Sequence, residues 1–135
     1  MKMSDRYDIL DHAPKVAAEQ IHGLMKRFIE HAVIKAKRDR WLQLSQSPKK
    51  LYSKFSGLWN SLDTSIAVEV LNLDSLPAHS YVYHCMDEHG YLLTADQASI
   101  VGGAEDGFLF DQDSDRVFFL THESDYYEYT IPKRG

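Results

Sequence analysis

Hydrophobic side chains in the first half of the chain recur at steps of three and four residues. From residue 14 to residue 33 these positions are Ile21, Leu24, Met25, Phe28, Ile29, Ala32 and Val33. This spacing lines one face of an α-helix, and a proline is well tolerated in the first helical turn. We therefore predict a helix from Pro14 to Val33.

A second helical pattern follows in "SPKKLYSKFSGLWNSL". Ser47 is a suitable N-cap and Pro48 fits the first helical position. The apolar positions form a single stripe, made of Leu51, Tyr52, Phe55, Leu58, Trp59 and Leu62. We predict a helix from Pro48 to Leu62, with Trp41 and Leu42 anchoring a connecting helical segment before it.

The second half of the chain changes to short runs rich in Val, Phe, Tyr and Thr. These runs are "SYVYHCM", "GFLF", "RVFFLTH" and "YYEYTI", and Asp, Ser and Gly bound them, as is typical of antiparallel strands. Between the first two, "LLTADQASIVGG" predicts a short helix, because Thr94 and Gln97 have capping-box spacing and Gly102 or Gly103 can end it. Residues 64–79 are compatible with a connector or with a short strand.

Helices first and strands second indicate an α+β fold in one domain, residues 1–135. We expect two to three N-terminal helices (helical region 14–62) packed on a C-terminal antiparallel sheet (sheet-rich region 80–131), with one short helix between strands. Tight turns should lie at residues 112–114 and 123–125. The 135 residues are 44% hydrophobic and 26% charged, which is enough for one hydrophobic core.

The net charge differs strongly between the two halves. Residues 1–67 hold 12 Lys and Arg against 7 Asp and Glu, whereas residues 68–135 hold 3 against 13. No apolar run approaches the roughly 18 residues of a membrane span, and the first ten residues carry charges where a secretory signal is apolar. We therefore expect a cytoplasmic protein without membrane association. The single cysteine, Cys85, should be a reduced core residue.

A basic segment, residues 35–54, raises the question of nucleic-acid binding. Its principal basic side chains are Lys37, Arg38, Arg40, Lys49, Lys50 and Lys54. Helical periodicity places the neighbouring rings on the apolar face and the lysines on the solvated face, so the rings are not available for base stacking. Nucleic-acid binding is therefore kept as the alternative function and not as the main one.

The candidate metal-binding and catalytic motifs in the sequence are incomplete. In "DQDSD", Asp111, Asp113 and Asp115 have the alternate spacing that opens a calcium loop, but Arg116 stands where glycine is needed and His122 where the bidentate Glu belongs. The histidines lack zinc-site spacing. Glu105 and Asp106 with His84, His89 or His122 could do general acid/base chemistry, as in many acidic sheets. We predict no metal, no cofactor, no catalytic residues and no enzyme activity.

Three stretches together resemble a known group of proteins: "KRDRWLQLSQSPKKLYSKFSGLW", "SYVYHCMDEHGYLLTADQASIVGG" and the hairpin "GFLFD…DRVFFLTHES". They are similar to a family of small, largely uncharacterised bacterial proteins with a basic R-x-R helical segment, a lysine-rich helix and a V-G-x-G loop. The resemblance extends from about Phe28 to Tyr129, and "AEDGFLF" departs from the pattern. The acidic hairpins are also similar in texture to immunity proteins of the Smi1/Knr4 type. The resemblance implies a compact α+β unit and no known reaction.

Two functions of different class follow from the charge pattern. The first is a non-enzymatic protein-binding module, such as an immunity or antitoxin-like protein, that uses an acidic sheet surface against a basic partner. The acidic residues of that surface are Glu105, Asp106, Asp111, Asp113, Asp115, Glu123 and Asp125. The second is nucleic-acid binding through the basic segment. The basic segment could also complement acidic residues of a second copy of the chain, so a homo-oligomer is compatible with the sequence.

Overall fold

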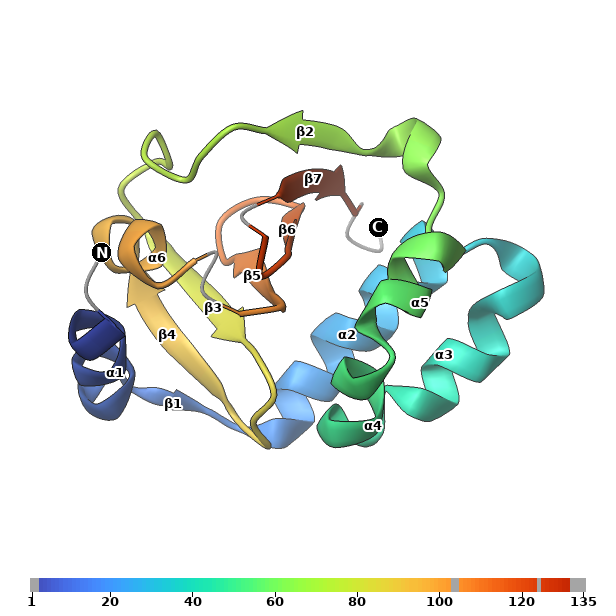
Figure 1. Ribbon diagram of the computed structural model, residues 1–135, viewed down its shortest axis with the longest axis horizontal. Helices are drawn as coiled ribbons and strands as arrows, with labels where there is room; N and C mark the ends of the chain where they lie inside the picture. Colours follow the sequence, from blue (N-terminus) through green and yellow to red (C-terminus); the bar gives the residue numbers. More distant parts are fainter. Residues whose placement is uncertain (1–2, 103–104, 124, 132–135) are drawn as a thin grey trace.

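The computed structural model of the protein describes residues 3–102, 105–123 and 125–131 (Figure 1). The first half contains α1 (Met3–His12), β1 (Lys15–Val16), α2 (Ala18–Ala32), η1 (Lys35–Lys37), α3 (Arg38–Leu44), α4 (Pro48–Ser53), α5 (Phe55–Ser61) and η2 (Thr64–Ile66). The second contains β2 (Val68–Val70), β3 (Ser80–His84), β4 (Gly90–Thr94), α6 (Ala95–Val101), β5 (Gly107–Asp111), β6 (Arg116–Leu120) and β7 (Tyr126–Thr130). The fold is α+β, as the sequence predicts.

All seven described strands form one sheet with the order β1-β4-β3-β5-β6-β7-β2, and every neighbouring pair is antiparallel. Strands β3, β5, β6 and β7 correspond to the four predicted strands of the C-terminal sheet, and β4 is an additional strand that was not predicted. The two edge strands, β1 and β2, come from earlier in the chain. The short β2 lies in residues 64–79, so that stretch holds a strand together with connecting segments.

The sheet lies between two groups of helices (Figure 1). Because side chains alternate along a strand, Phe108 and Phe110 of β5 join the core beneath α2 to α5, while Leu109 joins the core beneath α1 and α6. Strand β5 is therefore buried along its whole length. Helices were predicted to pack on the sheet, and they cover both of its faces.

Several local predictions are confirmed. Thr94 and Gln97 form the capping box of α6: the Gln97 N–H donates to the Thr94 hydroxyl at 3.2 Å, and the Thr94 N–H donates to the Gln97 amide oxygen at 3.0 Å. Gly102 is the C-cap, and the alternative Gly103 lies outside the described residues, as does Ser124 of the second predicted turn. Trp41 and Cys85 are buried.

The predicted start of the first long helix is wrong. Helix α2 begins at Ala18, and Pro14 precedes the edge strand β1. The carbonyl oxygen of Pro14 accepts a hydrogen bond from the Leu92 N–H at 2.9 Å. This bond to β4 holds the chain in an extended conformation where the sequence suggested a first helical turn. Helix α1, outside the predicted helical region, packs Leu10 into the second core.

The predicted helix from Pro48 to Leu62 is divided into α4 and α5 by Lys54, whose φ of −120° and ψ of 24° are not helical. Ser47 makes no side-chain capping bond. The predicted apolar stripe still faces the sheet: Tyr52 reaches His84, and Phe55 stacks on Phe119 at 4.5 Å between ring centroids. Tyr52 and Phe55 lie on either side of this break, and their rings stack with centroids 5.4 Å apart.

None of the helices in the described part of the chain has the length and apolar character required to cross a membrane.

Candidate functional site

The acidic residues lie at two opposite ends of the sheet. Glu105 and Asp106 precede β5, and Glu123 and Asp125 lie between β6 and β7; we call this the cleft end. Asp111, Asp113 and Asp115 lie at the turn between β5 and β6, which we call the hairpin end. Five-residue strands separate the two ends by about 15 Å. The seven carboxylates therefore do not form one surface.

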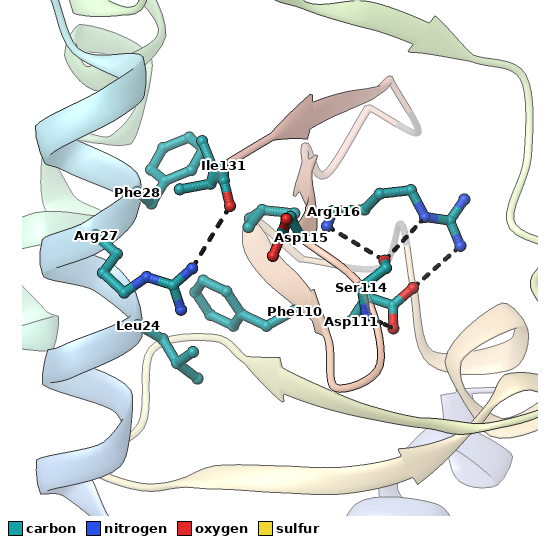
Figure 2. A pocket seen from close by; sticks show the side chains of 10 residues that line it. Leu24, Arg27, Phe28, Phe110, Asp111, Ser114, Asp115, Arg116 and Ile131 are labelled. Carbon is teal, nitrogen blue, oxygen red and sulfur yellow. Dashed lines mark hydrogen bonds and ion pairs between the residues drawn. The ribbon is translucent and has the colours of Figure 1, made fainter. Parts of the chain in front are cut away.

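At the hairpin end, Asp111 is held by several donors (Figure 2). Its buried carboxylate lies 2.6 Å from His79 Nε2 and accepts from Arg116 Nη2 at 3.0 Å. The backbone N–H groups of Asp113 and Ser114 also donate to it, at 2.9 and 3.2 Å. Burial acts to raise the pKa of Asp111, but these hydrogen bonds outweigh it and lower the pKa below its ordinary value. Asp111 is thus the anchor of the turn.

The hollow between this turn and α2 is small (Figure 2). Its volume is about 20 Å³, and it is lined in part by Arg27, Asp115 and Arg116. That is room for about one water molecule. One Asp115 carboxylate oxygen is buried against it without a protein partner in the described chain, and Asp113 lies 3.5 Å from His79 Nδ1. Of these carboxylates, Asp111 holds the turn through its hydrogen bonds, and the hollow is too small for an organic ligand.

The cleft end has two adjoining pockets, which we call together the acidic cleft. The first, of about 250 Å³, lies between α5 and the ends of β6 and β7 and is lined by Phe55, Ser56, Trp59, Asn60, Asp106, Phe119, Thr121, His122, Glu123, Asp125 and Tyr127. The second, of about 240 Å³, is lined by Tyr52, Met86, Glu105, Asp106 and His122. Asp106 and His122 belong to both.

The floor of the first pocket is aromatic. Phe55 and Phe119 are almost fully buried there, and Trp59 and Tyr127 are partly buried. The Trp59 and Tyr127 rings stack with centroids 4.2 Å apart. The cleft therefore combines ring faces with carboxylates, although the helical stripe predicted Trp59 only as a core residue.

Asp106 and His122 form the polar centre of the cleft. Asp106 Oδ1 accepts from the backbone N–H of His122 at 2.9 Å and lies 2.8 Å from its ring Nδ1. The hydrogen bond to Asp106 and the charges of Asp106 and Glu123 raise the pKa of His122. Since the ring is well exposed, it is an accessible titrating group at the rim.

The remaining carboxylates of the cleft differ in their partners. Glu105 is 3.2 Å from the guanidinium of the buried Arg6. Glu123 lies 3.8 Å from His122 Nε2, and no Lys or Arg in the described chain is within ion-pair range of Glu123 or Asp125. These two exposed carboxylates are therefore available to an incoming cation.

Beneath the second pocket, Tyr52 and His84 form a buried pair. His84 Nε2 lies 2.8 Å from the Asp87 carbonyl oxygen, and Nδ1 lies 2.9 Å from the Tyr52 hydroxyl. A carbonyl only accepts, so Nε2 carries the proton and Nδ1 accepts from Tyr52. Burial lowers the pKa of His84 and raises that of Tyr52. His84 is thus a neutral structural residue.

The basic residues separate into two groups. Lys37, Arg40 and Lys54 line a hollow of about 500 Å³ on the other side of α5, with Trp41 in its wall; we call it the basic hollow. Lys49 and Lys50 are exposed on α4 and do not line it, and Arg38 Nε donates to the Val33 carbonyl at 2.8 Å. The neighbouring rings of Trp41, Tyr52 and Phe55 are buried, as the helical pattern predicts.

The described residues contain no group of three or more His, Cys, Asp or Glu side chains placed to hold a metal ion. Burial, with the nearby charges of Asp87 and Glu105, raises the pKa of Cys85 to about 12, so its thiol is not an activated nucleophile. The acidic cleft places carboxylates beside aromatic ring faces, two kinds of group that can each attract a cationic side chain.

Sequence reasoning named Asp106 and His122 separately but could not pair them, since His84 and His89 were equally open candidates. The signal that could have paired Asp106 with His122 was the predicted hairpin of β5 and β6. Gly107 pairs with Leu120, so the residues just outside that pair are brought together. The contribution of Trp59 and Tyr127 had no such signal, because it depends on how α5 meets β7.

Comparison with protein-family models, curated proteins and solved structures gave no match.

Proposed function

We propose that this protein is a non-enzymatic protein-binding module whose acidic cleft receives a lysine or arginine side chain of a basic partner. The observation that carries the proposal is the placement of Glu123 and Asp125 beside the stacked rings of Trp59 and Tyr127 in one pocket. Neither carboxylate has a Lys or Arg partner in the described chain.

A cationic side chain matches this arrangement in two ways. Its charge meets the carboxylates, and its face or methylene stem can lie against the ring of Trp59 or Tyr127, a contact worth about 0.5–2 kcal/mol depending on desolvation. Arginine fits best, since its planar group can stack on a ring while donating to a carboxylate. Clustered negative charge would also accelerate encounter with a basic protein.

An immunity or antitoxin-like role is the specific form of this function that we favour. A nuclease has a cationic substrate groove, and an acidic module that covers it would block access by nucleic acid. If a toxin-like reading frame adjoins the gene, its product is the first partner to test. That product should compete with an arginine peptide for the acidic cleft.

The direct test is binding of a fluorescent octa-arginine peptide, followed by anisotropy. Glu123→Gln combined with Asp125→Asn should weaken binding by at least about tenfold, since two carboxylates are neutralised where the cation sits; tenfold corresponds to about 1.4 kcal/mol. Both side chains are exposed, so the variant should fold normally.

The matched control is Asp8→Asn combined with Asp113→Asn. These residues are exposed and lie away from the cleft, with 79% and 64% of their side-chain surfaces accessible. The control changes the net charge by the same amount and should leave binding within about twofold. Equal weakening in both double variants would show that the peptide responds only to the overall charge and would refute the site.

Nucleic-acid binding remains the alternative, supported by the gathering of Lys37, Arg40 and Lys54 around one hollow. Buried rings and an overall charge of −5 argue against it. A gel shift with mixed single- and double-stranded probes at about 50 mM salt tests it where phosphate contacts are strongest. We expect no shift; a shift lost on Lys37→Ala with Arg40→Ala would support the alternative.

A further inference from the structure

The acidic cleft and the basic hollow share one wall. Ser56 and Asn60 of α5 line both. They are four residues apart, so they lie one above the other on the same helix face, and both are exposed. The two depressions are therefore the two flanks of a single short polar ridge.

The flanks carry opposite charge. Lys37, Arg40 and Lys54 lie on one side, all exposed. In the described part of the chain, no ion pair joins any of these three cations to a carboxylate. Across the ridge, Glu123 and Asp125 also lack a Lys or Arg partner. Both sets of charges thus face solvent across a ridge of two small side chains.

A surface of this kind is complementary to itself. In a two-fold dimer, a residue i of one subunit meets residue j of the other, and j meets i in return. If the axis runs along the ridge, rotation by 180° brings the cations of each copy over the carboxylates of the other. The short side chains of Ser56 and Asn60 would permit close approach at the axis.

We propose that a second copy of this chain docks on α5 about a two-fold axis, with the basic hollow of each subunit against the acidic cleft of the other. The inference rests on the proposed function, because the same carboxylates hold either the second copy or the basic partner. Partner binding and self-association are then mutually exclusive. Binding of the basic partner therefore dissociates the dimer into monomers.

The contacts are between exposed charges, so the dimer is salt-sensitive. The screening length is about 10 Å at 0.1 M salt and about 3 Å at 1 M. Sedimentation velocity at low salt should show a concentration-dependent species that stops at twice the 15.5 kDa chain mass. It should shift to monomer at high salt. Growth beyond the dimer would overturn the two-fold arrangement.

Charge reversal identifies the surface. Arg40→Glu with Lys54→Glu makes both flanks acidic, and Glu123→Lys with Asp125→Lys makes both basic. Each double variant alone should be monomeric, with its dissociation constant raised by at least about tenfold. An equimolar mixture should form a heterodimer, because the residues reversed in one variant face residues of opposite sign in the other, with Lys37, the third cation that lines the hollow, left unchanged. All four residues are exposed, and thermal unfolding verifies that the variants fold.

Two outcomes overturn the dimer. One is a wild type that remains monomeric at low salt, including the case in which Arg40 and Lys54 bind a nucleic-acid probe instead. The other is a wild-type dimer that neither reversal dissociates, which would place the interface elsewhere. An equimolar mixture of the two reversed variants that stays monomeric would likewise show that the interface does not join these two surfaces.

The Arg40→Glu and Lys54→Glu variant also separates this inference from the proposed function. Its acidic cleft is intact and no second copy competes for it, so it should bind octa-arginine at least as tightly as the wild type. If it binds the peptide and the wild type never dimerises, only the dimer fails. If the wild type dimerises and this variant does not bind, only the proposed function fails.

Discussion

The two ends of the sheet use the same residue types for different purposes. At the hairpin end, Asp111 is buried and its oxygens accept from His79, Arg116 and two backbone N–H groups. At the cleft end, Glu123 and Asp125 are exposed beside a pocket of about 250 Å³. A carboxylate whose lone pairs are satisfied within the chain has little left for a partner.

Packing distinguishes the two ends as clearly as charge. The acidic cleft has an aromatic floor continuous with the first hydrophobic core, whereas the hollow at the hairpin end holds only about one water molecule. We therefore expect the protein's free energy of unfolding to be most sensitive at the cleft end to its aromatic residues, and at the hairpin end to Asp111.

The largest expected effect is on the floor of the cleft. Phe55→Ala should lower the free energy of unfolding by about 3–5 kcal/mol, because it removes a buried ring from the stack with Phe119. Trp59→Ala should cost less, about 1–3 kcal/mol, because the indole is only partly buried. Urea unfolding measures both. A larger loss for Trp59 would show that its ring belongs to the core and not to the cleft wall.

The next effect compares the carboxylates of the two ends. Asp111→Ala should lower the free energy of unfolding by about 1–3 kcal/mol, since it leaves donors of the turn without their acceptor. Glu123→Gln with Asp125→Asn should change it by less than about 0.5 kcal/mol, as exposed substitutions usually do. If both variants lose the same stability in urea, the carboxylates of the two ends do not differ in their contribution to folding.

Acid titration sharpens the same contrast. The folded protein lowers the pKa of Asp111 below its ordinary value of 3.8, so this carboxylate stabilises the fold above that pH. The contribution disappears as the pH falls through the folded pKa. The stability difference between wild type and Asp111→Asn should therefore shrink below pH 3.8. A difference that stays constant during acid unfolding would contradict the role of the charge.

The smallest effect concerns the pH dependence of peptide binding. The hydrogen bond to Asp106 raises the pKa of His122 above 6.5, and His122 is the single imidazole among the described residues that line the acidic cleft. Its deprotonation removes a positive charge, so octa-arginine should bind about two- to fivefold more tightly as the pH rises through that pKa.

The control for this prediction is His122→Gln, which retains the backbone N–H that donates to Asp106. The variant should bind the peptide with the same affinity from about pH 6 to pH 8, the range in which an imidazole titrates. A wild-type affinity that is unchanged over this range, or that falls as the pH rises, would contradict the assignment.

Local patterns predicted the elements whose stability is local. The stripe from Leu51 to Leu62 and the capping box of α6 depend on neighbours within a few residues, and both are confirmed. The break at Lys54 could not be predicted, because the apolar spacing continues through it without interruption. Strand β1 depends on a bond from Leu92 to Pro14, which no periodicity reveals.

The candidate site was predicted in composition but not in arrangement. The acidic residues were predicted to share one surface, yet strand direction places Asp111 and Asp106 at opposite ends of β5. Counting acidic residues along the sequence does not reveal that they lie at opposite ends of the sheet. The pairing of Asp106 with His122 follows from the β5–β6 register, and the wall formed by Trp59 depends on a helix and a strand far apart in sequence.

The position of β5 and β6 in the chain has a consequence for synthesis on the ribosome. The apolar stripes of α2 to α5 are completed by Phe108, Phe110 and Phe119, which are translated long after the helices. Until those strands emerge, the nascent helices carry an uncovered hydrophobic face that is prone to aggregation or to chaperone capture. The protein is therefore expected to acquire its cooperative fold only after β5 and β6 have emerged, since both cores include residues of these strands.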